Sequence, residues 1–138
     1  MKEFKVKSLL GDYQLYNLTI NKNFFSKNKK NVFYLIDKNI YKKNKIINKI
    51  KKNYLLIDSN ENTKSYEQIY NLIKKLLKKK IRRDTVIYAI GGGILQDVSS
   101  FIASILFRGI KWNFIPTTIL AQCDSCIGGK TSINFWKF

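Results

Sequence analysis

The sequence contains no histidine, one proline and two cysteines, and its acidic residues number 9 against 26 lysines and arginines. Two cysteines are too few for a disulfide framework, and the stretch Met1–Lys7 lacks the apolar core of a secretory signal peptide. No apolar run reaches the roughly 18 residues that span a bilayer, because Val98–Phe107 contains serines and lies between Asp97 and Arg108. These shortages exclude a disulfide-stapled secreted domain and a membrane-spanning protein, and we expect a cytoplasmic location.

The formal net charge of +17 favours contact with polyanions such as nucleic acids or anionic membranes. Only Arg82, Arg83 and Arg108 are arginines, and the lysine excess accompanies many asparagine, isoleucine, tyrosine and phenylalanine residues, a set typical of A- and T-rich coding sequence. We therefore interpret most of the charge as a solvated lysine surface, with nucleic-acid binding as the alternative. We expect no sequence-specific nucleic acid and no membrane among the partners.

The 138 residues are 45% hydrophobic and 14% aromatic, which predicts one domain with a packed core. The lysines are concentrated in runs at 27–30, 42–52 and 74–80, whereas Asp84–Gly129 is nearly neutral. Six of the seven glycines lie from Gly91 onward. Because glycine lets a backbone approach a ligand closely, we expect the chemistry in this second part of the chain.

Apolar runs and amphipathic stretches alternate along the chain. A hairpin is predicted at the start, from Phe4–Leu10 and Tyr13–Ile20 on either side of Gly11-Asp12. Buried strands are predicted at Asn31–Asp37, Tyr54–Ile57, Thr85–Ile90 and, closed by Pro116, Trp112–Ile115. Helices are predicted at Ile40–Lys52, Tyr66–Lys80 and Leu95–Phe107, and a polar loop at Ser59–Lys64.

This order of elements predicts an α/β fold: a Rossmann-like parallel sheet with flanking helices, preceded by a β-hairpin. Ligands of such sheets bind at the carboxyl ends of the strands. The segments that follow predicted strands should share that edge, and they are Asp37, Ser59–Lys64, Gly91–Asp97 and the chain from Pro116 onward.

The glycine triplet Gly91-Gly92-Gly93 lies between a predicted strand and a predicted helix. Free amide groups and the helix dipole favour an anion at such a place, so a phosphate site is one interpretation and a tight turn is the other. Asp97 is interpreted either as an acid of the first helical turn or as an acceptor for a ribose hydroxyl group.

Further motifs follow the triplet in a fixed order. They are Arg108-Gly109, then Pro116-Thr-Thr-Ile-Leu-Ala-Gln-Cys-Asp124, then Gly128-Gly-Lys-Thr131 with Asn134 close behind. Together with the triplet and Asp97, this series resembles the 3-dehydroquinate synthase family of NAD-dependent sugar-phosphate cyclases. The resemblance is sharp over Ala89–Asn134 and more diffuse before it.

The resemblance implies a role for each matching residue. NAD would be bound by Asp37, Asn39, Glu61, Lys64, Gly91, Gly92, Gly93, Asp97, Thr117 and Thr118. The sugar phosphate and its reaction would be served by Asp124, Lys130, Arg108 and Asn134, with Arg108 reaching the phosphate across the interface of a homodimer. Carboxylates suit substrate hydroxyl groups, and lysine and arginine suit phosphate.

The family reaction that the resemblance implies releases phosphate from 3-deoxy-arabino-heptulosonate 7-phosphate and forms 3-dehydroquinate, with NAD used and regenerated. The family binds zinc or cobalt through a helical second domain, whose glutamate and two histidines have no counterpart here. We therefore interpret residues 1–138 as the nucleotide-binding half alone, inactive by itself. A related substrate such as sedoheptulose 7-phosphate, or a non-catalytic NAD-binding module, is the alternative.

Cys123 and Cys126 form a C-x-x-C pair. By itself such a pair indicates half of a zinc site or a redox pair. The sequence has no histidine and no further cysteine to complete a tetrahedral zinc site. We therefore interpret both cysteines as small core residues and expect no metal ligand in this chain.

Overall fold

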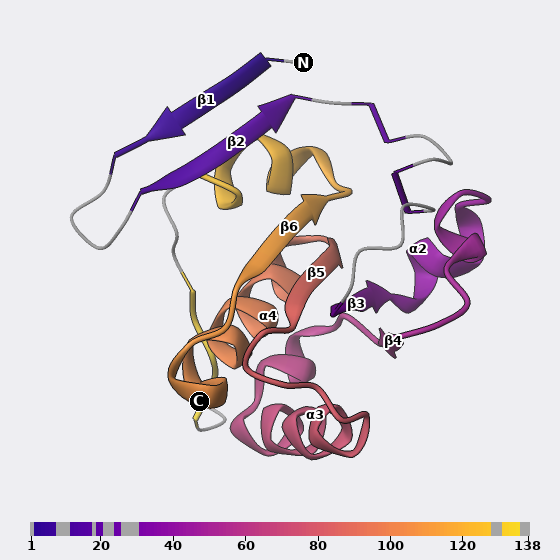
Figure 1. Ribbon diagram of the computed structural model, residues 1–138, viewed down its shortest axis with the longest axis vertical. Coiled ribbons are helices and arrows are strands. Elements are labelled where there is room, and N and C mark those ends of the chain that lie inside the picture. Colours follow the sequence, from indigo (N-terminus) through magenta and orange to yellow (C-terminus); the bar gives the residue numbers. More distant parts are fainter. Residues whose placement is uncertain are drawn as a thin grey trace.

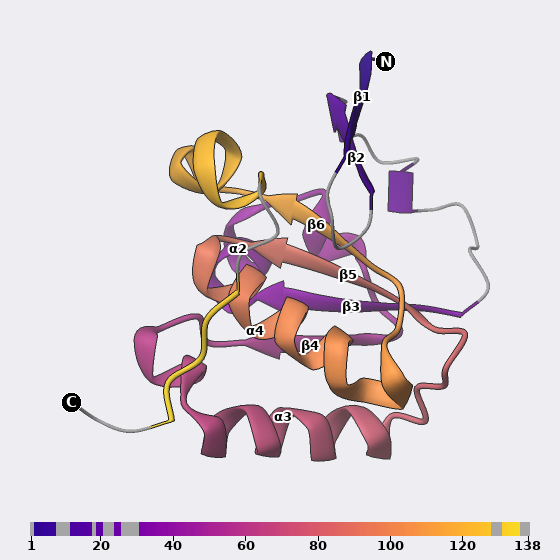
Figure 2. The same cartoon turned by 90° about the vertical axis from the view of Figure 1, so that its left-hand side faces the viewer.

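The computed structural model describes residues 2–7, 12–17, 19–20, 24–25, 31–127 and 131–135 (Figures 1 and 2). Its strands are β1 (Lys2–Val6), β2 (Tyr13–Asn17), β3 (Val32–Asp37), β4 (Tyr54–Ile57), β5 (Val86–Gly91) and β6 (Trp112–Pro116). Its helices are α2 (Lys38–Lys43), α3 (Tyr66–Lys78) and α4 (Gly93–Ile105), with shorter helical turns η1 (Ile47–Lys49), η2 (Glu61–Lys64), η3 (Leu106–Arg108) and η4 (Ala121–Ser125). None of the described helices is long and apolar enough to cross a membrane.

The N-terminal hairpin is confirmed, with shorter strands than predicted. β1 and β2 pair antiparallel, with Phe4 opposite Leu15. Ile20, predicted at the end of the second strand, lies beyond it, and Leu10 and Gly11 lie outside the described residues. The hairpin forms a two-stranded sheet of its own, separate from the main sheet.

The main sheet is parallel and has the strand order β4-β3-β5-β6, which confirms the Rossmann-like α/β prediction. The strands are in register, with Leu35 of β3 between Leu55 of β4 and Ala89 of β5. From β3 the chain moves outward to β4, crosses back over β3 to β5 and continues to β6 (Figure 2). The direction of winding therefore reverses between β3 and β5, and doubly wound sheets bind ligands at such a reversal.

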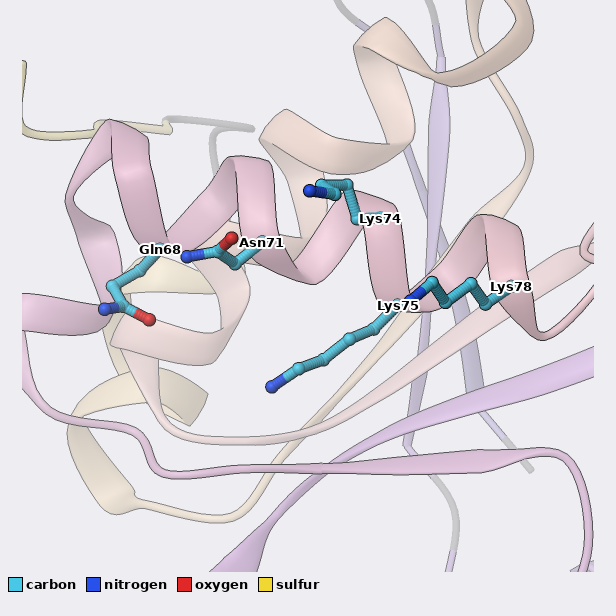
Figure 3. Close-up of a pocket in the computed structure, with 5 residues that line it drawn as sticks. All are labelled: Gln68, Asn71, Lys74, Lys75 and Lys78. Atoms are coloured by element: carbon cyan, nitrogen blue, oxygen red, sulfur yellow. The ribbon is translucent and has the colours of Figure 1, made fainter.

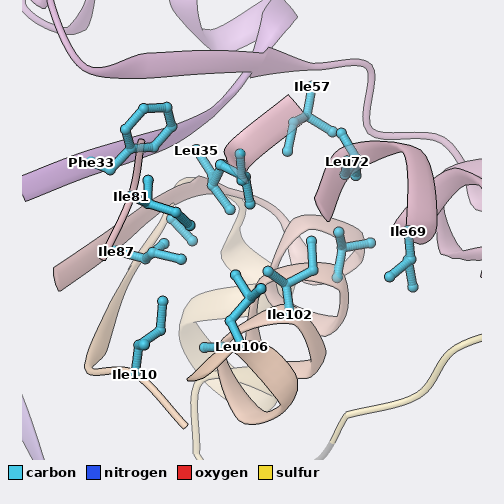
Figure 4. Close-up of a cluster of buried hydrophobic side chains, with 14 of the residues drawn as sticks. Phe33, Leu35, Ile57, Ile69, Leu72, Ile81, Ile87, Ile102, Leu106 and Ile110 are labelled. Atoms are coloured by element: carbon cyan, nitrogen blue, oxygen red, sulfur yellow. The ribbon is translucent and has the colours of Figure 1, made fainter. Parts of the chain in front are cut away.

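Helices cover both faces of this sheet. α3 and α4 lie on one face and enclose the larger apolar cluster, in which Leu35 and Ile87 have no exposed surface (Figure 4). α2 and η1 lie on the other face, where Ile36 and Ile90 pack against Ile47. Because successive residues of a strand point to opposite faces, the neighbours Leu35 and Ile36 belong to different clusters. Burial of each such side chain contributes about 1.5–3 kcal/mol, and this packing fixes the strand ends that carry the site.

α3 follows the apolar pattern of its sequence. Ile69, Leu72 and Leu76 recur at helical spacing and are buried against the sheet. The helix ends before the predicted boundary at Lys80, which adopts a left-handed conformation with φ 57°. Leu77, predicted on the apolar stripe, is 47% exposed, so the buried stripe is narrower than expected.

The single helix predicted at Ile40–Lys52 is wrong. α2 ends because Asn44 leaves the helical conformation, with φ −99° and ψ 111°. The side-chain oxygen of Asn44 accepts hydrogen bonds from the backbone N–H groups of Ile46 and Ile47 and starts η1. An asparagine side chain competes for backbone donors in this way, and here it divides an otherwise helical pattern. Ile47 and Ile50 are buried nevertheless.

Two further boundaries shift where strands meet the helices that follow them. The polar loop predicted at 59–64 contains the turn η2, because Asn60 and Thr63 cap each other. β5 continues into Gly91, and α4 begins at Gly93, before its predicted start. The glycine triplet is therefore the direct link between a strand and a helix.

Candidate functional site

A cleft of about 300 Å³ opens at the carboxyl edge of the sheet, where the winding reverses. Its walls come from the ends of β3, β4, β5 and β6 and from the starts of α2 and α4. They are formed by Asp37, Ile40, Ser59, Gly92, Gly93, Ile94, Thr117 and Thr118. Five residues of this wall were predicted from the sequence to bind NAD: Asp37, Gly92, Gly93, Thr117 and Thr118.

Asp37 is the last residue of β3 and caps α2. Its Oδ1 accepts hydrogen bonds from the backbone N–H groups of Asn39 (2.8 Å) and Ile40 (3.0 Å), and the residue is 9% exposed. Such a cap holds the carboxylate in a fixed orientation. Its Oδ2 accepts no hydrogen bond from the described residues and is free for a ligand hydroxyl group.

The glycines bring the start of α4 to the cleft. Gly92 caps α4 without a side chain, so the first N–H groups of the helix have no partner within it. A Cβ on Gly92 would lie 3.3 Å from Cγ2 of Thr118 and would narrow the cleft. A Cβ on Gly91 would lie 2.7 Å from Cδ2 of Leu95, so Gly91 serves close packing of β5 on α4 and does not line the cleft.

Two hydroxyl groups of the cleft wall have no hydrogen-bond partner in the described part of the chain. They are Oγ of Ser59 and Oγ1 of Thr117, and both atoms are shielded from solvent. Thr117 is held in place by its backbone N–H, which donates to the carbonyl of Gly91 (2.9 Å). An unpaired buried hydroxyl group costs about 1–3 kcal/mol, so these positions suit a ligand that supplies polar partners.

The other predicted nucleotide residues form an ion cluster, here defined as Glu61, Lys64 and Asp97. The ammonium group of Lys64 lies 3.0 Å from Oδ2 of Asp97 and 3.5 Å from Oε1 of Glu61, and the Lys64 side chain is 13% exposed. Burial alone lowers the pKa of Lys64, but the hydrogen bond and charge of Asp97, and then those of Glu61, hold the pKa above its ordinary value. Asp97 lies beyond the first turn of α4, so the interpretation as a first-turn acid is wrong.

The chain near Asn134 docks onto the ion cluster. The backbone N–H of Asn134 donates to the carbonyl of Lys64 (2.8 Å), and its side-chain amide donates to Oε1 of Glu61 (3.1 Å). The hydroxyl group of Thr131 donates to the backbone carbonyl of Asp97 (2.9 Å). The structure therefore brings Asn134, predicted to serve the substrate, against Lys64 and Glu61, which were predicted to bind the nucleotide.

Asp124 is exposed and lies in η4, which follows Thr118 of the cleft wall in the sequence. This turn is fastened at both ends: the backbone N–H of Ala121 donates to Oγ1 of Thr118 (3.2 Å), and the buried amide of Gln96 donates to the carbonyl of Ser125. The sequence analysis did not single out Gln96. The feature that could have indicated it is an amide side chain on the inner, otherwise mostly apolar face of the helix that follows the glycine triplet.

Asn39 and Arg108 also lie in neither group. Asn39 is exposed and lies outside the cleft wall. Arg108 is exposed and follows α4, which runs from the carboxyl edge towards the opposite edge of the sheet (Figure 2). The 13 residues of α4 span roughly 20 Å, so Arg108 is far from the cleft of its own chain. Lys130 lies outside the described residues.

Both cysteines are free thiols. Cys123 is exposed, so its interpretation as a core residue is wrong. Cys126 is partly buried and donates a hydrogen bond to the carbonyl of Gln122 (3.1 Å), and burial raises the pKa of its thiol. Within the ranges that the structure describes, no group of three or more histidine, cysteine or acidic side chains could hold a metal ion. The described residues therefore do not fit the zinc or cobalt that the family resemblance implies.

A larger hollow, of about 400 Å³, lies open on the outer face of α3 (Figure 3). Its walls are side chains of this one helix: Gln68, Asn71, Lys74, Lys75 and Lys78. No predicted site residue that the structure describes lines it, and no second described element closes it. We interpret it as part of the solvated lysine surface, so the smaller cleft is the candidate site.

The chain is similar to proteins of a known family. The sequence profile described as 3-dehydroquinate synthase N-terminal matches residues 53–138, more than half of the chain. The chain belongs to the 3-dehydroquinate synthase family. The resemblance drawn from the motifs is thereby confirmed.

Curated relatives agree with this assignment. The 3-dehydroquinate synthase of Alkaliphilus oremlandii (strain OhILAs) is 44% identical over 111 residues, which cover 77% of this chain and 31% of the relative. The 3-dehydroquinate synthase of Buchnera aphidicola subsp. Cinara cedri (strain Cc) is 39% identical over 142 residues, which cover 97% of this chain and 38% of the relative. This member of the 3-dehydroquinate synthase family thus spans about a third of the length of these relatives.

Solved structures of sugar-phosphate cyclases share the fold. A 2-deoxy-scyllo-inosose synthase complexed with carbaglucose-6-phosphate, NAD+ and Co2+ is 27% identical, with a TM-score of 0.64 over 76% of this chain and 31% of that one. The 2-epi-5-epi-valiolone synthase ValA from Streptomyces hygroscopicus subsp. jinggangensis 5008, with NAD+ and Zn2+ bound, matches 96% of this chain and 40% of its own, with a TM-score of 0.70 at 22% identity.

Proposed function

We propose that the cleft binds NAD and that the chain forms the nucleotide-binding part of an NAD-dependent sugar-phosphate cyclase. The observation that carries this proposal is the meeting of Asp37, Gly92, Gly93, Thr117 and Thr118 in one cleft at the reversal of winding. The free amides at the start of α4 suit a pyrophosphate. Oδ2 of Asp37 and the unpaired hydroxyl groups of Ser59 and Thr117 suit the hydroxyl and amide groups of a dinucleotide. The NAD+ in the 2-deoxy-scyllo-inosose synthase structure supports the choice of cofactor.

The reaction we propose for the whole protein is conversion of 3-deoxy-arabino-heptulosonate 7-phosphate to 3-dehydroquinate with release of phosphate, as the names of the relatives suggest. Bound NAD supplies the hydride acceptor for a ring hydroxyl group. Asp97 would accept a ribose hydroxyl group while Lys64 holds its carboxylate. Asp124, Lys130 and Asn134 would contact the sugar phosphate. The described residues fit no metal, so no metal-dependent step is assigned to them.

A different sugar phosphate is the second candidate substrate. The observation in its favour is that a structure similar to this chain holds carbaglucose-6-phosphate. We also propose a homodimer, because Arg108 lies at the end of α4 away from its own cleft and would contact phosphate only in a second copy. A cytoplasmic location is part of the proposal, and the free thiols of Cys123 and Cys126 are consistent with a reducing compartment.

The test of NAD binding uses the two unpaired hydroxyl groups. Thr117→Val and Ser59→Ala should leave the free protein as stable as before, because neither hydroxyl group has a partner to lose among the described residues. Each should weaken NAD binding about five- to tenfold in a calorimetric titration. Ser99→Ala is the matched control, since Ser99 has the same kind of unpaired buried hydroxyl group but lies outside the cleft wall. Failure of the unaltered chain to bind NAD at millimolar concentration would refute the proposal.

Turnover is tested by supplying the rest of a cyclase. The chain alone should release no phosphate from the sugar phosphate, and fusion to the second domain of a related cyclase should restore release that depends on NAD and on zinc or cobalt. Ile119 and Leu120 are 81% and 75% exposed, so the fusion should also reduce aggregation by covering them. Lys130→Ala should abolish the restored activity and leave NAD binding intact. Metal-dependent phosphate release by the 138-residue chain alone would contradict this assignment.

A further inference from the structure

Gln96 is a buried polar residue for which the proposed chemistry has no use. It is 4% exposed, on the face of α4 where Leu95 and Val98 have no exposed surface. Burial of an amide group is unfavourable unless the amide is hydrogen-bonded, so an apolar residue would suit packing better. Nε2 of Gln96 donates to the backbone carbonyl of Ser125, 29 positions further along the chain. The role of Gln96 should therefore be sought in this long-range bond.

The bond connects the two sides of the site. The backbone N–H of Gln96 donates to the carbonyl of Gly92 (3.1 Å), so Gln96 lies one helical turn beyond the glycines of the cleft. Ser125 is the last residue of η4, the turn that carries Asp124. Its hydroxyl oxygen lies 3.7 Å from the position of a Cβ on Gly93. Gln96 thus spans from the dinucleotide side to the substrate side.

The other attachments of this turn lie at its opposite end, where the Gln122 amide donates to the carbonyl of Pro116 (3.3 Å). Oγ1 of Thr118 accepts the backbone N–H of Ala121 (3.2 Å), the first residue of the turn, whereas Gln96 holds Ser125, where the turn ends. Loss of the Gln96 donor would leave the first end capped and release the second. Asp124 adjoins the second end, so its position depends on Gln96.

We propose that Gln96 is a positioning residue that sets the place of Asp124 relative to a dinucleotide in the cleft. It acts through Ser125 and touches neither the dinucleotide nor the substrate. The inference rests on the proposed function, because it requires a dinucleotide packed against Gly92 and Gly93. Such a ligand restrains the start of α4, and the Gln96 bond transmits the restraint to residues 121–127.

Two thiols in the turn report on this coupling. Cys126 follows Ser125 directly and is partly buried, with its thiol donating to the carbonyl of Gln122 (3.1 Å), so loosening of the turn should speed its alkylation. Cys123 is exposed and serves as the internal reference. The measurement is the rate at which iodoacetamide modifies each thiol, read by mass spectrometry with and without saturating NAD.

In the unaltered chain, NAD should slow alkylation of Cys126 relative to Cys123 about fivefold or more. Gln96→Met keeps the length of the side chain but has no donor, and Gln96→Asn is too short to reach Ser125. In both variants Cys126 should react about fivefold faster without NAD, and NAD should still bind but no longer change that rate. Ser104→Ala is the matched control, because it removes a side-chain bond to the carbonyl of Phe101 (2.7 Å) near the far end of α4.

Each outcome decides the matter. Equal protection of Cys126 by NAD in Gln96→Met and in the unaltered chain would mean that Gln96 only fills space, and the inference would be wrong. NAD binding without any effect on Cys126 in the unaltered chain would also overturn it. Absence of NAD binding to the unaltered chain would instead refute the proposed function, and the inference with it. Circular dichroism checks folding, and if Gln96→Met unfolds, Gln96→Asn carries the same comparison.

Discussion

The cleft and the ion cluster both lie at the carboxyl edge of the sheet, but their polar groups are satisfied in different ways. In the cleft, the hydroxyl groups of Ser59 and Thr117 have no partner among the described residues. In the ion cluster, Lys64 lies within 3.5 Å of both Asp97 and Glu61. Residues predicted together as nucleotide ligands therefore divide into groups left open for a ligand and groups that hold two segments of the chain together.

The largest effect on stability should come from a side chain placed between β5 and α4, behind the cleft. Gly91→Ala places a Cβ 2.7 Å from Cδ2 and 3.0 Å from Cβ of Leu95, so β5 and α4 must move apart. We expect a loss of about 2–3 kcal/mol in the free energy of unfolding, measured by urea denaturation.

Gly93→Ala is the control for this substitution. The nearest atom to its Cβ is Oγ of Ser125 at 3.7 Å, an ordinary contact, so stability should change little. Equal losses in the two variants would show that the triplet is sensitive to any side chain, and that close packing at Gly91 is not the cause.

Removal of the cation from the ion cluster should have the next largest effect. Lys64→Met leaves Asp97, whose side chain is 23% exposed, without its ion-pair partner. We expect a loss of about 1–2 kcal/mol in the free energy of unfolding. We also expect weaker docking of the segment at 131–135, measured by amide exchange of Asn134, because Lys64 holds the Glu61 oxygen that accepts the Asn134 side chain. Lys64→Arg keeps the charge and should keep the segment docked. Undocking in Lys64→Arg as well would mean that the shape of the lysine, and not its charge, holds the segment.

The ion cluster should also give stability a particular pH dependence. Folding raises the pKa of Lys64 above its ordinary value of 10.5, so its contribution is complete below that pH and is lost as pH rises through the folded pKa. The difference in unfolding free energy between the unaltered chain and Lys64→Met should therefore stay constant from about pH 7 to about pH 10 and shrink above it. A difference that shrinks already near neutral pH would contradict the pairing.

The buried strands of the fold were predictable from the sequence, whereas one of its helices was not. Strands buried on both faces require long apolar runs, and the runs at Asn31–Asp37 and Thr85–Ile90 therefore predicted β3 and β5 within one residue at either end. The prediction of one helix at Ile40–Lys52 was wrong because the Asn44 side chain accepts hydrogen bonds from backbone N–H groups that would otherwise have continued the helix. Periodicity reports the apolar face but not a local competition for hydrogen bonds.

The site was predictable to the extent that its residues follow strands. Asp37 and Thr117 were expected at one edge because parallel strands end together, and the structure places both in the cleft wall. The pairing of Lys64 with Asp97 and the bond from Gln96 to Ser125 could not be predicted, because each joins segments about thirty positions apart. A single sequence does not show which polar groups satisfy one another after folding.

Substitutions of Asp37 should have a moderate effect and should separate its capping of α2 from its proposed binding of NAD. Asp37→Asn keeps the side-chain oxygen that caps α2 but removes the charge, so stability should change by less than about 0.5 kcal/mol while NAD binding weakens about tenfold. Asp37→Ala removes the cap as well and should cost about 1 kcal/mol of stability in addition. Titration and urea denaturation measure the two effects separately. Unchanged NAD affinity in Asp37→Asn would leave the residue with a capping role alone.

The smallest effect tests whether the cleft and the ion cluster act independently. The hydroxyl group of Thr131 is exposed and donates to the backbone carbonyl of Asp97 (2.9 Å), on the side of the cluster that faces residues 131–135. Thr131→Val keeps the shape of the side chain and removes this bond, and an exposed neutral hydrogen bond contributes at most about 0.5–1 kcal/mol. We expect a loss of stability at or below the lower end of that range, and an NAD affinity that stays within about twofold of the unaltered value. If the free energy of NAD binding fell by more than the free energy of unfolding, the docked segment would shape the cleft. The cleft and the ion cluster would then form one site.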